Sequence, residues 1–292
     1  MKPAPFKYHL PSTLDEALEL LGTLENAKIL AGGQSLLPMM NFRFVMPDHL
    51  IDLNMVSELQ GLEVNLGSIR IGAMTRQHAI HVSPIVRQFT PLVVEAYDNV
   101  SHRQIRNRGT YGGSLCHLDP SSEQPCFTAA LDGVILVASR RGNREIPIAE
   151  WAAMYMTPSI EADELMTGAR LAIWPPGHGW CFEEYARRHG DYAIVGVAVL
   201  VILDEARHIK RLSVTICGID AAPVRLTLAE EELVGQEAGD ETINRICEIT
   251  KTIENVMEDA HHSADYRRHL MQVLTDRAMR KAFDRATPGG SS

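Results

Sequence analysis

The spacing of apolar and polar residues predicts that helices and short strands alternate in the first part of the chain. Ser12 is the N-cap candidate of a first helix, and Gly22 ends that helix. Short apolar runs at residues 28–31 and 49–53 predict strands, and residues 36–41 between them predict a helical turn. We therefore expect a β-α-β-like unit with a glycine-containing loop between its first strand and its helix.

The next region mixes strand patterns with a helical pattern. Residues 68–73, 134–138 and 170–174 predict strands, and residues 84–100 predict a helix. The sequence Pro-Pro-Gly-His-Gly at residues 175–179 is the clearest break in the chain, because proline and glycine interrupt both helices and strands. We place a domain boundary after residue 177.

The last region opens with two apolar runs, residues 193–203 and 209–219, whose separation by a polar turn predicts a hairpin. Two helices are predicted to follow, at residues 240–257 and 263–283. The predicted units are, in order, a domain of residues 1–177 with subdomains of about 1–58 and 59–177, a domain of residues 178–285, and a disordered tail of residues 286–292.

Composition excludes several classes of function. The chain has 292 residues and a net charge of −9, which disfavours nucleic acids and anionic membranes as partners. The longest apolar run, residues 192–203, is too short to span a bilayer, so we expect no membrane span and a soluble, cytoplasmic protein. The five cysteines show no C-x-x-C spacing, and no nucleophile–base arrangement stands out. We therefore predict neither a metal site nor a catalytic side chain in this chain.

Two glycine pairs carry the main functional signal. They lie in the loops at residues 29–36 (ILAGGQSL) and 109–114 (GTYGGS), and neither matches G-x-G-x-x-G or G-x-x-x-x-G-K-[ST]. Consecutive glycines let backbone amides converge on an anion such as a phosphate. The second loop is followed by His117, Asp119 and Glu123, and carboxylates accept hydrogen bonds from sugar hydroxyls. A dinucleotide fits both features.

These motifs resemble a known family. The combination of Ala-Gly-Gly-Gln-Ser at residues 31–35, Thr-x-Gly-Gly-Ser at 110–114 and Asp-Pro-x-x-Glu-x-Pro at 119–125 is similar to the FAD-binding medium subunit of molybdenum hydroxylases. Carbon monoxide dehydrogenase, quinoline oxidoreductase and xanthine dehydrogenase belong to this family. Residues 163–168 resemble the family's loop beside the flavin ring, and residues 187–193 resemble the start of its C-terminal domain. The likeness runs from about residue 6 to residue 283.

The resemblance implies an α+β fold of the PCMH/vanillyl-alcohol-oxidase type, in which two subdomains clasp FAD. A C-terminal α/β domain with a three-stranded antiparallel sheet and a helical bundle would follow. It also implies cofactor-binding roles. The FAD pyrophosphate would be wrapped by the backbone of the first loop, at Ile29, Leu30, Ala31, Gly32, Gly33, Gln34, Ser35 and Leu36. The second loop would close over it with Gly109, Thr110, Gly112, Gly113 and Ser114. Ribose, ribityl or phosphate oxygens would be bound by His117, Asp119 and Glu123, and the flavin ring would have Leu165, Met166 and Tyr192 beside it.

The implied function is that of an electron-transfer subunit. FAD in this chain would take electrons from the 2Fe–2S clusters of a small partner subunit and pass them to an external acceptor, while a large molybdopterin-binding subunit hydroxylates the substrate. A dimer of such heterotrimers, a heterohexamer, is expected. The sequence departs from the family at Tyr111, where a smaller aliphatic residue is common, and at residues 182–185, which lack the lysine of eukaryotic relatives. The electron acceptor is therefore left open.

Two other functions remain open from the sequence. A free-standing FAD-dependent oxidoreductase of the same fold, such as an alcohol oxidase or an enolpyruvyl reductase, would need its own substrate lid and catalytic acid. A non-catalytic nucleotide-binding module would need neither. The substrate of the whole enzyme, whether an N-heterocycle, a purine, an aldehyde or carbon monoxide, is decided in another subunit.

Overall fold

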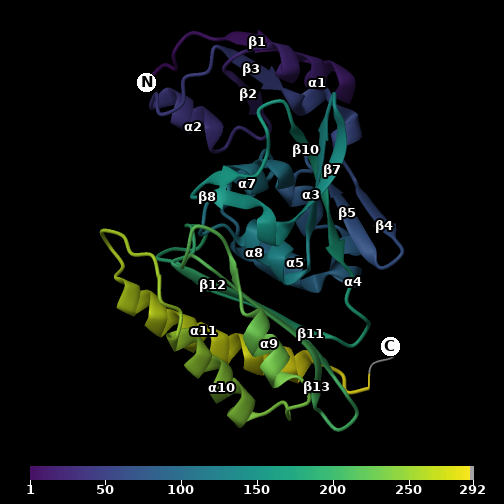
Figure 1. The fold of residues 1–292 in the computed structure, drawn as a ribbon, viewed down its shortest axis with the longest axis vertical. Helices are drawn as coiled ribbons and strands as arrows, with labels where there is room; N and C mark the ends of the chain where they lie inside the picture. Colours follow the sequence, from purple (N-terminus) through teal and green to yellow (C-terminus); the bar gives the residue numbers. More distant parts are fainter. Residues whose placement is uncertain (290–292) are drawn as a thin grey trace.

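Three main sheets follow one another along the long axis of the molecule, with the N-terminal sheet at one end and the C-terminal sheet at the other (Figure 1). This computed structural model describes residues 1–289. The order of the sheets along the axis follows their order in the sequence, so each predicted region of the chain corresponds to one tier of the molecule.

The N-terminal tier is a three-stranded parallel sheet in the order β1-β3-β2, covered by a helix. The predicted β-α-β unit is confirmed, with its glycine loop between β2 and α2. The first helix begins differently, because Thr13 and not Ser12 is its N-cap and accepts a hydrogen bond from the Glu16 amide. The bounds are β1 Lys7–His9, α1 Leu14–Thr23, β2 Ala27–Leu30, α2 Leu36–Asn41 and β3 His49–Asp52.

The middle tier is a five-stranded antiparallel sheet in the order β4-β5-β10-β6-β7. The helix predicted at residues 84–100 is two helices, because Pro91 has no amide hydrogen to continue the first one. The bounds are β4 Leu62–Asn65, β5 Ser68–Gly72, α3 Gln77–His81, α4 Pro84–Phe89, α5 Pro91–Asn99, α6 Arg103–Arg106, α7 Tyr111–His117, α8 Glu123–Ala130, β6 Val134–Ser139, β7 Gly142–Pro147, β8 Ala152–Met154, β9 Thr157–Pro158 and β10 Leu165–Ala172.

The C-terminal tier is an antiparallel sheet in the order β11-β12-β13-β14, with a helical pair against it. The predicted hairpin is β12 with β13. Three long strands match the expected sheet, and the two-residue strand β14 adds a short fourth edge. The bounds are β11 Gly179–Tyr185, β12 Val195–Leu203, β13 Ile209–Cys217, β14 Val224–Arg225, α9 Thr227–Leu233, α10 Asp240–Lys251 and α11 Ala264–Arg285.

One hydrophobic core joins the middle and C-terminal tiers. Tyr97 of α5, Tyr111 of α7 and Phe127 of α8 are fully buried in it, and the same cluster continues into Phe182 of β11 and Leu200 of β12. Burial of large apolar surface is the main stabilising contribution in a folded chain. The sheet of the C-terminal tier is therefore held firmly against the helices that carry the second glycine loop.

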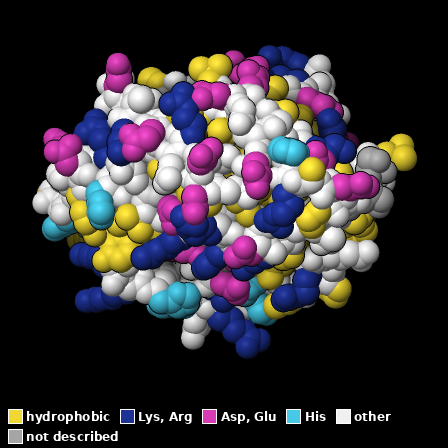
Figure 2. All heavy atoms as spheres, turned by 90° about the horizontal axis from the view of Figure 1, so that it is seen from below, with side chains coloured by type: hydrophobic (Ala, Val, Ile, Leu, Met, Phe, Trp, Pro, Cys, Tyr) yellow, Lys and Arg dark blue, Asp and Glu magenta, His cyan; other side chains and the backbone are white. Residues whose placement is uncertain are grey.

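The end of the chain differs from the prediction of a disordered tail at residues 286–292. Ala286 is buried, and the amide of Thr287 donates to the carbonyl of Gly177 at 2.9 Å. The ordered chain thus continues beyond the predicted boundary, and residues 290–292 of the predicted tail lie outside the described residues. On the C-terminal face, basic and acidic side chains are interspersed (Figure 2), and some pair closely, as Arg280 does with Asp240 at 2.6 Å.

Candidate functional site

The first glycine loop presents a run of unpaired backbone amides. Ile29 and Leu30 belong to β2, so the turn begins at Ala31 and ends where α2 starts at Leu36. The amides of residues 31–36 donate no hydrogen bond to any other residue of the described chain. Gly33 has φ +74°, a left-handed conformation that favours glycine. Unpaired amides at the start of a helix can donate to an anion, so this row of donors is a candidate site for one.

The second glycine loop uses its amides internally. The amide of Tyr111 donates to Thr75 at 3.0 Å, that of Gly112 to Ala73 at 2.8 Å, and that of Gly113 to the Thr110 hydroxyl at 3.1 Å. The amides of Gly109 and Ser114 are also paired, with the carbonyls of residues 105 and 110. Among the described residues, a run of unpaired amides is therefore found in the first loop, whereas in the second loop every amide except that of Thr110 is paired.

Glycine in the second loop serves close packing. A Cβ atom on Gly112 would lie 2.6 Å from the Cβ of Ala73, so a side chain there would collide with Ala73, the residue that directly follows β5. One on Gly109 would lie 2.4 Å from Oε1 of Gln77. The glycines let α7 begin directly against the sheet of the middle tier, which fixes the position of the residues that follow it.

The two loops are in contact. A Cβ atom on Gly32 would lie 2.5 Å from the carbonyl oxygen of Arg108 and 2.7 Å from the Cα of Gly109. One on Gly113 would lie 3.5 Å from the Cβ of Ala31. The loops come from different tiers and about eighty residues apart in the numbering, yet their backbones touch. The second loop therefore forms a wall beside the unpaired amides of the first.

The polar residues after the second loop gather near the same place. His117 ends α7 and is half-buried, and burial lowers its pKa while the carboxylate of Asp119 opposes that shift. Leu118 follows in a left-handed conformation, with φ +51°, and turns the chain toward Asp119. Oδ1 of Asp119 accepts a hydrogen bond from the Ser121 amide at 2.9 Å, which orients that carboxylate. Glu123 begins α8 and is buried.

Glu123 shares its surroundings with a carboxylate that the sequence did not predict. Burial and the neighbouring charge of Glu184 raise the pKa of Glu123, and burial raises the pKa of Glu184 in β11. Oε2 of Glu184 is buried and has no hydrogen-bond partner among the described residues. Two buried carboxyls without a cation between them favour the protonated form of at least one. No motif marks Glu184. It reaches this place because β11 pairs with β12, and β12 packs against α8.

Tyr192 brings the third tier to the same site. It lies between β11 and β12 and is 54% exposed. Desolvation of its hydroxyl and the nearby charges of Asp119 and Glu123 raise its pKa to about 12, while the side chain of Ser35 acts in the opposite direction. Ser35 of the first loop, Asp119 after the second and Tyr192 of the C-terminal tier are therefore neighbours.

Leu165 and Met166 are in a strand and not in the loop that was expected at residues 163–168. Both are buried in β10, paired with Ala138 and Val137 of β6, and the register shifts between Met166 and Gly168. The sulfur of Met166 lies 3.8 Å from that of Cys116 in α7. The start of β10 thus packs against α7, the helix that ends at His117.

Within residues 1–289 no group of three or more His, Cys, Asp or Glu side chains is placed to hold a metal ion, and the five cysteines are unpaired. No helix in the same range combines the length and apolar composition needed to cross a membrane. These findings concern only the described part of the chain.

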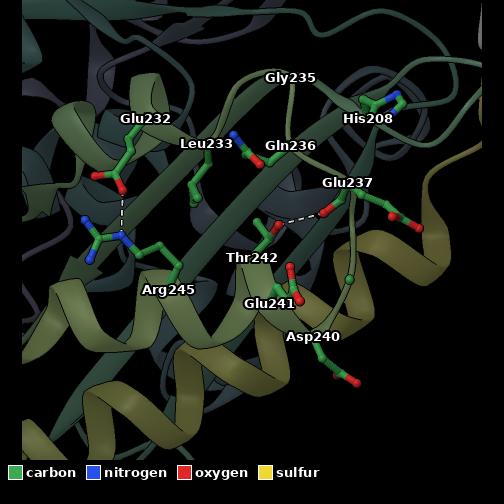
Figure 3. A pocket seen from close by; sticks show the side chains of 11 residues that line it. His208, Glu232, Leu233, Gly235, Gln236, Glu237, Asp240, Glu241, Thr242 and Arg245 are labelled. Atoms are coloured by element: carbon green, nitrogen blue, oxygen red, sulfur yellow. Dashed lines mark hydrogen bonds and ion pairs between the residues drawn. The ribbon is translucent and has the colours of Figure 1, made fainter.

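A cavity of about 730 Å³ lies away from the glycine loops, between α9 and α10 (Figure 3). Two pairs of its lining residues are bonded to each other: Arg245 donates to Glu232 at 2.5 Å, and the Thr242 hydroxyl donates to the carbonyl of Glu237 at 2.6 Å. None of the predicted site residues lines it. The cavity therefore carries no functional assignment.

Comparison with known proteins covers almost the whole chain. A family model described as the FAD binding domain in molybdopterin dehydrogenase matches residues 4–171, and one described as the CO dehydrogenase flavoprotein C-terminal domain matches residues 180–282. The chain is 37% identical to the 6-hydroxypseudooxynicotine dehydrogenase complex subunit alpha of Paenarthrobacter nicotinovorans, over 99% of this chain and 98% of that one. It is 36% identical to caffeine dehydrogenase subunit beta of Pseudomonas sp. (strain CBB1), over 98% and 97%.

A solved structure shows the same fold. A chain of carbon monoxide dehydrogenase from Hydrogenophaga pseudoflava, in a form that lacks the Mo-pyranopterin moiety, superposes with a TM-score of 0.95 at 33% identity, covering 98% of this chain and 100% of that chain. The expected fold class is thereby confirmed, and so is the resemblance to which the sequence motifs pointed.

Proposed function

The chain belongs to the family of FAD-binding medium subunits of molybdenum hydroxylases, and from this premise we propose that it carries electrons from the 2Fe–2S clusters of a small partner subunit to an external acceptor. FAD is the cofactor of this family and supplies the redox chemistry, while the protein holds it in place and shapes its electrostatic surroundings. A large molybdopterin-binding subunit and a dimer of heterotrimers complete the proposed assembly.

One observation carries the assignment of the site. The unpaired amides of residues 31–36 form a row of hydrogen-bond donors that suits a diphosphate. Since the whole chain has a net charge of −9, a dianionic diphosphate needs such local donors. The first loop therefore fits the cofactor of the family.

The other predicted residues are assigned supporting roles. Gly109, Thr110, Gly112, Gly113 and Ser114 form the wall that keeps the first loop in position, since four of their five amides are already paired within the chain. We assign hydrogen bonds with the sugar and ribityl hydroxyls to His117, Asp119 and Glu123; a protonated Glu123 can donate as well as accept. Tyr192 would lie against the flavin ring, and the start of β10, at Leu165 and Met166, would lie near the edge of the ring.

The test is purification of the chain from its native host. We expect a yellow complex with flavin absorbance that bleaches under dithionite, and copurifying subunits that contain molybdopterin and 2Fe–2S clusters. A yellow chain that turns over a substrate alone would favour a free-standing flavin oxidoreductase. A colourless preparation that does not take up added FAD would leave a non-catalytic nucleotide-binding module.

A further inference from the structure

A chain of hydrogen bonds joins the two glycine loops through Asn54 and Arg76, which belong to neither loop. Nδ2 of Asn54 donates to the carbonyl oxygen of Ala31 at 3.2 Å. The guanidinium of Arg76 donates to Oδ1 of Asn54 at 2.5 Å and to the carbonyl oxygen of Arg108 at 2.5 Å. Arg76 thus connects both loops with one planar group, a task that suits the fixed fork of arginine.

Asn54 is itself held in place. Its backbone N–H donates to Oδ1 of Asp52 at 2.8 Å, and its side-chain amide also donates to that carboxylate. Asp52 ends β3, is buried, and accepts a hydrogen bond from the hydroxyl of Tyr8 at 2.6 Å. Because Asp52 is fixed by the parallel sheet, the bonds from Asn54 and Arg76 start from a rigid element.

The peptide between Ala31 and Gly32 links this hydrogen-bond network to the direction of the Gly32 amide. In a planar trans peptide the carbonyl and the following N–H point in opposite directions. Since the Ala31 carbonyl points to Asn54, the Gly32 amide points away from it, and this amide belongs to the unpaired run of residues 31–36. Rotation of this peptide would turn a donor away and present a carbonyl oxygen to the ligand, which a phosphate group repels.

We infer that Arg76 is a positioning residue for the diphosphate of FAD: through Asn54 and Arg108 it fixes the direction of the first-loop amides. The inference rests on the proposed function and adds two residues that no motif of the glycine loops includes. Arg76 lies forty residues after the end of the first loop and more than thirty before the second, so only the fold brings it to both.

The test compares FAD affinity with the stability of the FAD-free chain. Arg76→Met removes both bridging bonds, whereas Asn54→Asp keeps an acceptor for Arg76 but removes the donor to Ala31. We expect each to weaken FAD binding about tenfold in a fluorescence titration of the stripped full-length chain, a loss of about 1.4 kcal/mol. Arg170→Met is the matched control, because Arg170 pairs with Glu145 at 2.6 Å on the middle sheet and contacts neither loop. Its FAD affinity should be unchanged.

The outcomes separate the inference from the proposed function. Unchanged FAD affinity in Arg76→Met, with melting temperatures that fall equally with and without FAD, would show a purely structural role and overturn the inference. Failure of the unaltered chain to bind FAD would overturn the proposed function instead. If Arg76→Met does not accumulate as a folded protein, Arg76→Lys replaces it; lysine keeps the charge but lacks the planar fork, so a smaller loss of affinity is expected and none would refute the inference.

Discussion

At the scale of single residues, the glycines of the two loops differ in what they contribute. Gly33 is required for its positive φ, whereas Gly32 is required because the Arg108 carbonyl lies where its Cβ would be. We expect Gly32→Ala to push the loops apart, lower the melting temperature and weaken FAD binding at least tenfold. Gly22→Ala is the control, since nothing lies within 4 Å of a Cβ there, and alanine in a helix is favoured over glycine by roughly 0.5–1 kcal/mol. Normal FAD content in Gly32→Ala would contradict the close contact.

Glu123 makes stability depend on pH in a defined direction. Burial and Glu184 raise its pKa from 4.5 to about 8, so the folded chain holds this proton more strongly than the unfolded chain does. Stability from this group is complete below pH 4.5 and is lost as the pH rises through about 8. We expect Glu123→Gln to flatten the decline in the melting temperature of the FAD-free chain between pH 5 and pH 8. Glu231→Gln, on an exposed surface, should keep the decline of the unaltered chain; identical slopes for all three proteins would refute the prediction.

Residues of the site were predictable where a short motif marks them and not otherwise. The glycine loops and the polar series after them are local patterns, so they could be read from the sequence. Asn54, Arg76 and Glu184 act on partners twenty or more residues away, through side chains that a local pattern does not distinguish from ordinary surface residues. The pairing of amides in the second loop was also hidden, because its acceptors lie at Ala73 and Thr75.

At the scale of elements, alternation and periodicity located about half of the strands and helices, and errors arose where tertiary packing decides. The segment at residues 163–168 was expected to be a loop because it resembles the family's loop beside the flavin ring, and a strand was predicted only at residues 170–174. In the structure this segment holds a register shift within β10, and the strand continues because β5 and β6 pair with it on both sides. A central strand supplied by distant partners has no local signature.

The helix α11 is tied to the beginning of β12 by a buried arginine. Arg267 donates to the carbonyl of Ile194 at 2.5 Å and to Oδ2 of Asp259 at 2.5 Å, and it also contacts the Gly218 carbonyl. We expect Arg267→Leu to lower the free energy of unfolding by about 3 kcal/mol in urea denaturation, because it leaves the carbonyl oxygens of Ile194 and Gly218 without this buried donor.

The neighbouring arginine supplies the control for this change. Arg268 pairs at 3.0 Å with Asp265, which is exposed, and such surface pairs contribute about 0–1 kcal/mol. Arg268→Leu should therefore change stability little. Equal effects of the two substitutions would show that burial of Arg267 does not matter. Since Ile194 lies two residues after Tyr192, loss of Arg267 should also weaken FAD binding if Tyr192 contacts the flavin.

At the scale of the whole molecule, the candidate site draws on all three tiers. Ser35, Asp119 and Tyr192 come from the N-terminal, middle and C-terminal tiers, and the charge of Asp119 and the side chain of Ser35 both act on the Tyr192 hydroxyl. A ligand bound there contacts each tier and therefore stabilises their arrangement as a unit. FAD at a hundred times its dissociation constant should add about 2.7 kcal/mol to the free energy of unfolding.

That gain should appear as a rise of roughly 5–10 °C in the melting temperature of the stripped chain, measured by calorimetry. An equimolar mixture of riboflavin and AMP is the sharpest control, because it offers the flavin ring and the adenosine but no diphosphate joining them. If the first-loop amides hold the diphosphate, the mixture should raise the melting temperature far less than FAD does. Equal rises would mean that the ring and the base alone supply the affinity and that the unpaired amides of residues 31–36 serve another purpose, while an unchanged melting temperature with FAD would mean that the assembled site takes a different ligand.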